Sequence, residues 1–136
     1  MFNPYYFDDP PSKKITDLIN YLCPMIESKT QIQFYYEDET DKSKKDWRLV
    51  NPHLIDIHKT SKQYLLSGWF IPSLPQQIGG KFPLGWALFK LERIDIQKLT
   101  ELKTAYKFTG RAYNPKDTRM KKIICCTAPV PNPAER

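Results

Sequence analysis

The sequence predicts a mainly β fold with an N-terminal helix, an α+β domain in which the strands form a small β-barrel. One segment with helical periodicity comes first, and four or five short segments with strand-like alternation follow it at spacings of roughly 10 to 25 residues. A chain of 136 residues can bury one hydrophobic core but is too short for a large two-domain enzyme. We therefore expect one domain over about residues 12–108, after a lead-in over 1–11 and before a basic, proline-rich tail over 109–136.

The helix is expected over about residues 12–28. Ser12 follows two prolines and can cap the first turn, because a serine hydroxyl accepts hydrogen bonds from the free N–H groups there. Pro24 cannot donate to the helical ladder, so it should either kink the helix or open a separate turn near its end. The apolar residues expected to pack on the sheet recur at steps of three and four: Ile15, Leu18, Ile19 and Leu22, with Met25 and Ile26 continuing the contact.

Two strands and a charged hairpin loop follow the helix. Residues 31–38 alternate cleanly, and the segment 37–46 is charged throughout, which is typical of a solvated loop. Residues 47–59 form the second strand, in which Pro52 removes a ladder donor and so implies a bulge or an edge position. The inward-facing residues expected on the first strand are Ile32, Phe34 and Tyr36.

The third strand, at residues 62–71, has apolar residues on both of its faces. A strand with one face in water would alternate apolar with polar residues, so a helix, a partner or a ligand must cover the second face. We expect Trp69 and Trp86 to serve in packing, and both can lie beneath the helix. Alternation divides the side chains into two rows: Tyr64, Leu66, Gly68 and Phe70 on one face, and Gln63, Leu65, Ser67, Trp69 and Ile71 on the other.

The next part of the chain contains a long loop and two further strand segments. Residues 72–85 carry three prolines and three glycines and are expected to form one long loop. Loops of this length often have a function. Residues 86–99 then predict a strand, a turn at 92–93, and the start of another strand with Ile94 and Ile96 on one face.

The tail begins with a basic segment and ends in prolines. Its apolar run at 123–126 can add an edge strand, either to this barrel or to a neighbouring molecule. The basic side chains can follow the phosphates of a nucleic acid. They are Arg111, Lys116, Arg119, Lys121 and Lys122.

Charge is the compositional feature that bears most on function. The chain has 21 Lys and Arg against 15 Asp and Glu, a net charge of +6. Such a balance attracts anions, including nucleic acid, although many basic proteins bind none. No apolar run approaches the length that spans a bilayer, and the N-terminus lacks the pattern of a secretory signal. We therefore expect a cytoplasmic protein with no membrane partner.

Residues that usually carry out chemistry are sparse. Of three cysteines, Cys125 and Cys126 are adjacent and poorly placed to bridge separate elements, which suits a reducing compartment. His53 and His58 lie five apart on a strand and point to opposite faces, so no metal site is expected. No cysteine has a visible activating base, and no paired-carboxylate, serine or phosphate-loop motif occurs. We expect neither an enzyme nor a cofactor.

Four short motifs in order along the chain carry a resemblance to a known family. They are IQFYY at 32–36, RLVNP at 48–52, QYL at 63–65 and FKLERI at 89–94. Together they resemble the WYL domain, a small SH3-like or Sm-like β-barrel of bacterial transcriptional regulators and of regulators of defence systems. The chain departs from the family pattern at three positions: Gln63 replaces the usual tryptophan, Ser67 replaces a small alanine, and Ala87 stands where arginine is frequent.

The resemblance implies binding rather than catalysis. WYL domains are thought to recognise nucleic acid or nucleotide-like effectors through basic and aromatic residues and to signal to an attached output domain. The residues here that match are Arg48, Tyr64, Lys90 and Arg93. Guanidinium groups bind phosphates with two hydrogen bonds, and aromatic rings stack on bases. We therefore expect single-stranded nucleic acid or a nucleotide effector to bind at this surface. No DNA-reading module is expected within this chain, and a protein partner can supply the output domain.

Each of these residues also has an ordinary structural interpretation. Tyr64 suits a place in the core, and Arg48 or Arg93 can instead be half of an ion pair, for instance with Glu92 or Asp95. A different class of function is a protein-interaction or self-association module without a nucleic-acid ligand. In that class the apolar second face, an exposed edge and the run at 123–126 seat a partner or a second copy in a homodimer.

Overall fold

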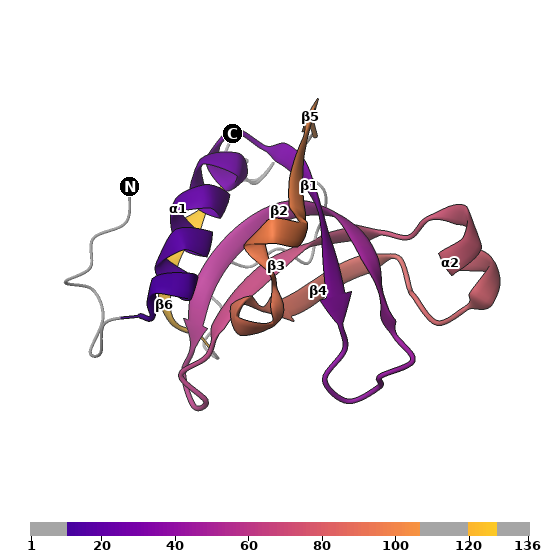
Figure 1. The fold of residues 1–136 in the computed structure, drawn as a ribbon. Helices are drawn as coiled ribbons and strands as arrows, with labels where there is room; N and C mark the ends of the chain where they lie inside the picture. The colour runs from indigo at the N-terminus through magenta and orange to yellow at the C-terminus, as the bar shows by residue number, and fades with distance from the viewer. Residues whose placement is uncertain (1–10, 107–119, 128–136) are drawn as a thin grey trace, which may run out of the picture.

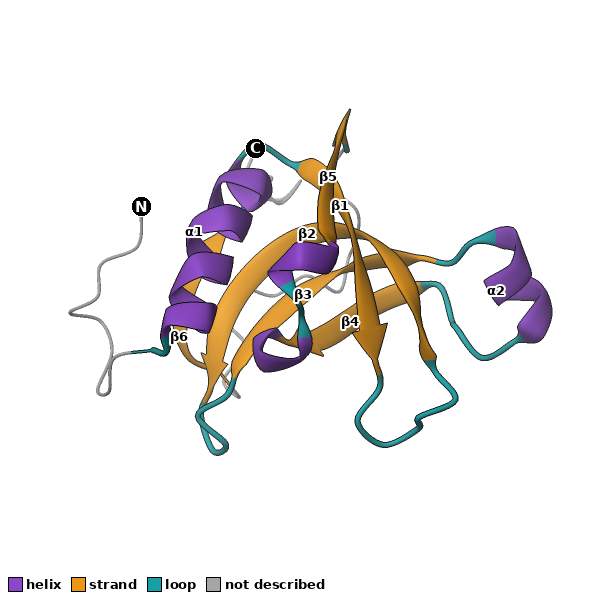
Figure 2. Cartoon of the chain, viewed as in Figure 1, coloured by secondary structure: helices purple, strands orange, loops and turns teal. Residues whose placement is uncertain are grey.

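The computed structural model of the protein describes residues 11–106 and 120–127, and for 120–123 it describes the backbone alone. The sheet is antiparallel, with strand order β4-β3-β2-β1-β5, and β6 pairs with β2 (Figure 1). The mainly β fold with an N-terminal helix is therefore confirmed, as a strongly curved sheet that does not close into a complete barrel (Figure 2). In chain order the elements are α1 (Lys13–Glu27), β1 (Thr30–Glu37), β2 (Lys45–His58), β3 (Tyr64–Ile71), α2 (Leu74–Gly79), β4 (Gly85–Lys90), the 3-10 turns η2 (Leu91–Arg93) and η3 (Ile96–Lys98), β5 (Leu99–Ala105) and β6 (Met120–Cys126).

Helix α1 begins and ends close to the predicted positions. The Ser12 hydroxyl accepts a hydrogen bond from the N–H of Ile15 at 3.2 Å, which satisfies one of the free donors of the first turn. Pro24 lies inside the helix and does not end it, since α1 continues to Glu27 and the N–H of Ser28 donates to the Pro24 carbonyl at 3.0 Å. The predicted residues Ile15, Leu18, Ile19, Leu22 and Ile26 are buried, Met25 is partly buried against the same core, and Cys23, which was not predicted, is buried beside them.

Strand β2 connects all parts of the sheet. Its first half pairs with β1, its second half pairs with β6, and β3 runs along its other edge. The register between β2 and β3 shifts between Pro52 and Leu54, which confirms the predicted bulge. The tail run at 123–126 thus adds a strand to this sheet, next to the second half of β2.

The hydrophobic core lies between α1 and the concave face of the sheet. Phe34 is fully buried and contacts the rings of Tyr36 and Phe89 edge to face, with centroids 6.1 and 5.0 Å apart. The row of β3 that faces α1 is the one containing Tyr64, Leu66 and Phe70, as Leu66 is fully buried in the same cluster. Apolar burial of this kind stabilises the fold by about 25 cal/mol per Å².

Aromatic side chains cover part of the other face of β3. Trp69 and Trp86 pair across β3 and β4, with ring centroids 5.6 Å apart. His53 lies 4.7 Å from Trp86 and 5.0 Å from Tyr106, and it is fully buried. The expectation that both tryptophans pack beneath the helix is therefore wrong, because Trp69 belongs to the strand row that alternates away from Leu66 and Phe70.

Two other expectations on local structure are wrong. The segment 72–85 contains helix α2, whose Ser73 hydroxyl and Gln76 side chain cap each other's backbone N–H groups in a capping box. The segment 91–98 forms two 3-10 turns instead of beginning a strand at Ile94. The Asp95 carboxylate accepts from the N–H of Gln97 at 2.9 Å, which favours a turn there, and β5 starts only at Leu99.

The cysteines also differ from expectation. Cys23 of α1 and Cys125 of β6 form a disulfide between residues 102 positions apart, with Cα atoms separated by 5.9 Å. Pairing of β6 with β2 brings Cys125 to the buried face of α1, whereas Cys126 is a free thiol. Adjacency along a strand therefore does not prevent one cysteine from bridging two elements, because neighbours point to opposite faces.

Within the described ranges, α1 and α2 both fall short of the length and apolar character that a membrane-crossing helix requires.

The close approach of β3 to β2 at Gly68 gives a test of the fold. A Cβ at Gly68 would lie 2.5 Å from Val50 Cγ1 and 2.8 Å from the Asn51 carbonyl oxygen. We expect Gly68→Ala to lower the free energy of unfolding by about 1–3 kcal/mol in urea titrations, because the backbone must shift. Gly79→Ala is the matched control, since a Cβ there meets no atom within 4 Å. Equal stability of the two variants would contradict this packing.

The disulfide gives a second test. We expect Cys23→Ser to lower the free energy of unfolding by about 2–5 kcal/mol under non-reducing conditions, because the bridge restricts the unfolded chain. Cys126→Ser removes the free thiol and should leave the stability close to that of the wild type. Reduction of the wild type should reproduce the Cys23→Ser midpoint, and an unchanged midpoint would argue against the bridge.

Candidate functional site

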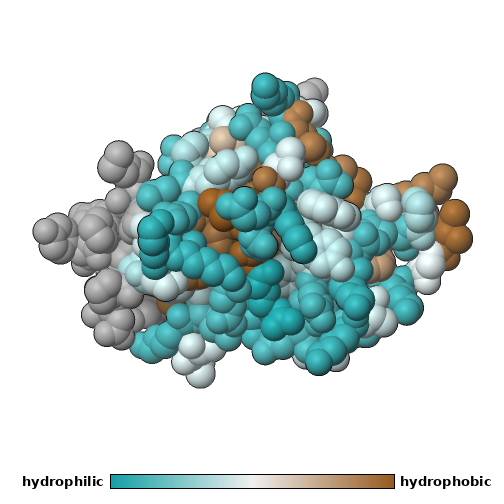
Figure 3. All heavy atoms as spheres, in the orientation of Figure 1, coloured by the Kyte–Doolittle hydropathy of each residue, from teal (hydrophilic) through white to brown (hydrophobic). Residues whose placement is uncertain are grey.

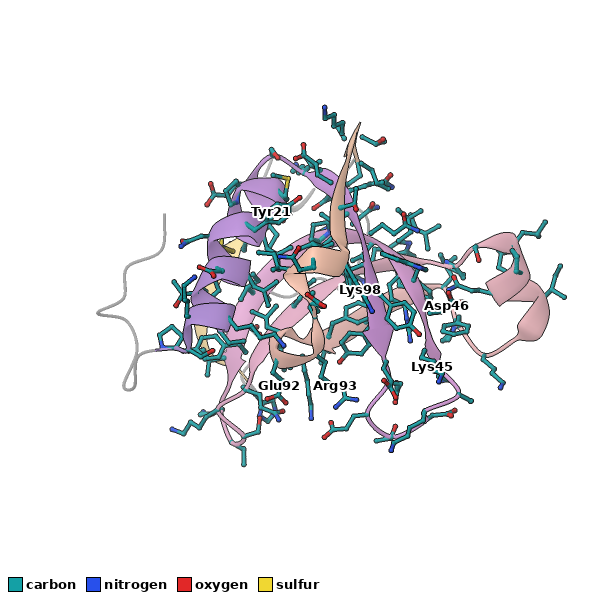
Figure 4. All side chains as sticks on the ribbon, in the orientation of Figure 1. Tyr21, Lys45, Asp46, Glu92, Arg93 and Lys98 are labelled. Carbon is teal, nitrogen blue, oxygen red and sulfur yellow. A yellow bond between two sulfur atoms is a disulfide. The ribbon has the colours of Figure 1, made fainter. Side chains whose placement is uncertain are left out.

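A few side-chain contacts, without a strand ladder, join β4 and the turn after it to the end of β1 and the β1–β2 loop, and we call this contact line the seam. The backbone N–H of Lys90 donates to the Tyr36 hydroxyl at 3.0 Å, and Arg93 Nε donates to the Glu37 carbonyl at 3.0 Å. The ammonium group of Lys90 also forms an ion pair with Glu39. Figure 4 shows Arg93 projecting from η2 toward the β1–β2 hairpin. These contacts hold the two edges together at one end and leave hollows between them.

Arg48 lies on the concave side of the curved sheet, beside the seam, in a region that we call the pocket mouth. It pairs with Phe34 across β1 and β2, so its side chain points to the concave face, and it is 7% exposed. Its guanidinium carbon lies 4.7 Å from the centroid of the Phe82 ring, 5.6 Å from Phe70 and 5.7 Å from Tyr36. Three aromatic faces therefore surround the positive charge.

The guanidinium group of Arg48 is only partly satisfied by the protein. Nη2 donates to the Lys44 carbonyl at 2.6 Å, whereas buried Nε has no hydrogen-bond partner among the described residues. Within the same residues Arg48 also forms no ion pair with a carboxylate. Burial lowers the pKa of Arg48, while Asp38 and Tyr36 oppose that effect. An arginine keeps its charge at neutral pH despite such a shift, so the mouth holds a buried cation.

Two hollows open along this seam. The one at Arg48 has a volume of about 160 Å³ and is walled by Phe70, Phe82 and the β4 residues 86–89, with Lys44 and Lys81 also lining it. The second has a volume of about 430 Å³ and is lined by polar residues that include His58, Gln63 and Lys90. Tyr36, Asp38 and Leu88 line both hollows, so the two are adjacent.

The carboxylate of Asp38 organises the loop beside the pocket. Its Oδ1 accepts from the N–H and the hydroxyl of Thr40, each at 2.9 Å, and from the N–H of Asp41 at 3.0 Å. Burial raises the pKa of Asp38, but these hydrogen bonds and nearby Lys44 outweigh it and lower the pKa overall. Asp38 is therefore ionised and engaged within its own loop.

Tyr36 connects the loop, the seam and the pocket. Burial raises its pKa, although the hydrogen bond from Lys90 and the charge of Arg93 act in the opposite direction. The phenol thus stays protonated at neutral pH. Its oxygen accepts from the Lys90 N–H, and Tyr36 lines both of the hollows beside the seam.

The structure brings together three of the four residues predicted for the site. Arg48, Lys90 and Arg93 gather around Tyr36, with Lys90 and Arg93 engaged across the seam. Tyr64 instead pairs with Ile57 on the concave face and packs against the core, so it lines neither hollow. Of the basic tail residues, Lys121 and Lys122 lie on β6, and Arg111, Lys116 and Arg119 lie outside the described residues.

Sequence reasoning missed several walls of the pocket. Tyr36 was expected only as an inward core residue, and Phe82 and Lys81 belong to the segment predicted as a loop. The adjacent basic and aromatic residues at 81–82 were the available signal. Ala87, at the position where the WYL pattern often has arginine, lines the pocket with a methyl group and adds no charge.

Comparison with known proteins gives a likeness in fold. No protein-family model and no curated protein matches the sequence. Among solved structures, proteasome accessory factor B/C (PafBC) of Arthrobacter aurescens is similar, with a TM-score of 0.52 and 18% sequence identity. The match covers 78% of this chain and 14% of the PafBC chain. At this identity the likeness concerns the fold alone.

The buried histidine on the convex face gives a pH-dependent test. Burial lowers the pKa of His53, and the charge of Lys29 acts in the same direction. The unfolded chain, in which histidine has a pKa of about 6.5, therefore binds this proton more readily than the folded chain. We expect stability to be full above about pH 6.5 and to fall as the pH drops from there toward the lowered pKa of the folded state.

Thermal unfolding of the wild type and of His53→Phe, followed from neutral to mildly acidic pH, measures this contribution. The phenyl ring keeps the aromatic contacts with Trp86 and Tyr106 but does not titrate. The variant should lose part of the acid-induced decrease in melting temperature. An identical pH slope in both proteins would show that His53 does not contribute.

Proposed function

We propose that this chain is a non-enzymatic, ligand-binding regulatory module, and that its pocket at Arg48 holds the anionic group of a nucleotide-like effector. One observation carries the proposal. Arg48 is 7% exposed, its Nε has no hydrogen-bond partner among the described residues, and it lines a pocket that opens to solvent. A desolvated cation without a carboxylate partner gains most from an anionic ligand.

The walls of the pocket favour a flat, aromatic anion over a simple inorganic one. Tyr36, which lines both hollows, offers its ring to a base, and Lys44 and Lys81 add positive charge beside Arg48. Lys81 is tied to the β1–β2 loop through a 3.3 Å hydrogen bond to Ser43, so both lysines lie on connected segments. Stacking with charge neutralisation is the combination that recognises nucleotides.

The size of the site favours a small effector or the terminal nucleotide of a single-stranded nucleic acid. The hollow at Arg48 has a volume of about 160 Å³, which accommodates a phosphate group but not a whole nucleotide. The adjacent hollow of about 430 Å³ falls within the range of small-molecule sites, which is roughly 300–1,000 Å³. A mononucleotide can place its phosphate against Arg48 and its remaining part over Tyr36 in the second hollow.

A role in regulation follows the resemblance to WYL domains and the likeness to PafBC. In this proposal the chain acts by binding and passes the signal to an output domain, which a protein partner can supply. The +6 net charge supports a long-range attraction for anionic effectors or nucleic acid.

Binding of labelled nucleotides and of a short labelled single strand, measured by fluorescence anisotropy at low and moderate salt, tests the proposal. Arg48→Gln should weaken binding by about 10- to 100-fold, as expected for loss of one charged hydrogen-bonding group. Lys13→Gln is the matched control, because Lys13 is an exposed cation on α1 that pairs with Asp17 and lines neither hollow. Affinity should fall as salt rises, since anion contacts release counterions.

Thermal unfolding of each variant shows whether a loss of binding reflects a loss of folding. Lys81→Gln, at an exposed position in the pocket lining, provides a second variant that need not disturb the core. Retained nucleotide binding in Arg48→Gln would contradict the proposal. Equal affinity for a nucleotide and its uncharged nucleoside would contradict it as well.

A further inference from the structure

The connection between β3 and β4 is held to the rest of the molecule by few contacts. Helix α2 is tied to the sheet through Gln76, whose side chain is buried and donates to the Trp47 carbonyl at 2.8 Å. The apolar side chains of Leu74 and Ile78 are 68% and 79% exposed and do not pack on the core. Figure 3 shows apolar atoms at the surface where α2 projects beyond the sheet. Hydrophobic burial therefore does little to fix this connection.

Residues 81–84, which we call the flap, follow α2 and lead into β4. Gly80 ends the helix with a φ of 73°, and Gly85 begins the strand with a φ of 138°. Both values lie where glycine is favoured. Among the described residues, no backbone–backbone hydrogen bond joins the flap to the rest of the chain, and the Lys81 side chain makes an exposed bond to Ser43 at 3.3 Å. The flap thus has a permissive residue at each end and little to hold it between them.

Phe82, on the flap, contacts the guanidinium group of Arg48. Its ring centroid lies 4.7 Å from the guanidinium carbon, closer than the rings of Tyr36 and Phe70. Tyr36 and Phe70 are buried on β1 and β3, whereas Phe82 is half-buried and lies outside the strands. Two of the three aromatic walls around Arg48 are therefore fixed by the sheet, and the third is carried by the flap.

The position of Arg48 Nε shows why one of these walls has to move. Nε is buried and has no hydrogen-bond partner among the described residues, so an oxygen atom of a ligand reaches it only when a wall is displaced. Strand ladders hold Tyr36 and Phe70 in place. The face of an aromatic ring is negatively polarised, so the Phe82 ring offers Arg48 a weak substitute for an anion. Displacing Phe82 is the movement that breaks the fewest contacts.

We propose that the flap masks Arg48 in the free protein, with the Phe82 ring over the guanidinium group until an anionic group displaces it. The flap turns about Gly80 and Gly85 when it opens. Phe82 is thus an internal competitor of the effector and not a stacking partner. The identity of the displacing anion rests on the proposed function, whereas the mask itself is a property of the free protein. Because only molecules with an open flap expose the guanidinium group, the mask lowers the apparent affinity for the effector.

Modification by phenylglyoxal, a reagent that attacks accessible arginine side chains, tests the mask without any nucleotide. Peptide mass spectrometry of the full chain follows the modification of Arg48 with time. Phe82→Ala should accelerate it by about 3- to 30-fold, the factor expected for loss of a partly desolvated cation–π contact. Phe82→Leu keeps apolar bulk but has no ring face, and it should also accelerate the modification.

Two controls separate opening of the flap from a general loosening of the fold. Leu84→Ala is the matched variant, because Leu84 lies on the flap, is 62% exposed and lines neither hollow. It should leave the Arg48 rate within about twofold of the wild type. Arg93, whose Nε donates to the Glu37 carbonyl away from the flap, is the internal reference and should react equally in all variants. Equal Arg48 rates in the wild type and Phe82→Ala, or a matching acceleration at Arg93, would overturn the inference.

Fluorescence anisotropy with a labelled mononucleotide distinguishes this inference from the proposed function. Phe82→Ala should lower the dissociation constant, because the internal competitor is gone. A dissociation constant that rises in Phe82→Ala would make Phe82 a ligand contact and would overturn the inference. If no variant bound the nucleotide while Phe82→Ala still unmasked Arg48, the proposed function would be contradicted and the mask supported.

Discussion

The bulge in β2 between Pro52 and Leu54 is the constraint on which the rest of the structure depends. Around this point β2 leaves its pairing with β1 and takes up pairing with β6, while β3 pairs with it on both sides of the bulge, from Leu49 to Ile57. The bend lets one sheet curve around the stripe of α1. It also brings the last residues of β1 against the far edge of β4, which creates the seam and the pocket mouth.

Much of the fold could be predicted because its patterns are local. The stripe of α1 and the alternation of β1 each repeat within one element, so their buried residues are visible in the sequence. Helix α2 was missed because a six-residue helix has too few turns to show a period, and its capping box at Ser73 was the remaining signal. The turns at 91–98 were missed because Ile94 and Ile96 alternate like a strand although Asp95 caps a turn.

The candidate site was predictable only in part, because its components come from distant positions. Arg48 was identified by resemblance, but its burial depends on Phe82, which lies 34 residues later in a segment expected to be irregular. The roles of Lys90 and Arg93 across the seam depend on how far the sheet curves, and no sequence pattern encodes that distance. The bridge from Cys23 likewise required the position of β6, which only the pairing with β2 fixes.

The disulfide has a mechanical consequence for the chain. It joins α1 to β6, so strands β1 to β5 belong to a covalently closed loop between Cys23 and Cys125. Tension applied to the segments before α1 and after β6 would pass through the bridge instead of through the sheet. Helix α1 and strand β6 would therefore carry such tension as one covalently joined unit, and strands β1 to β5 would bear none of it.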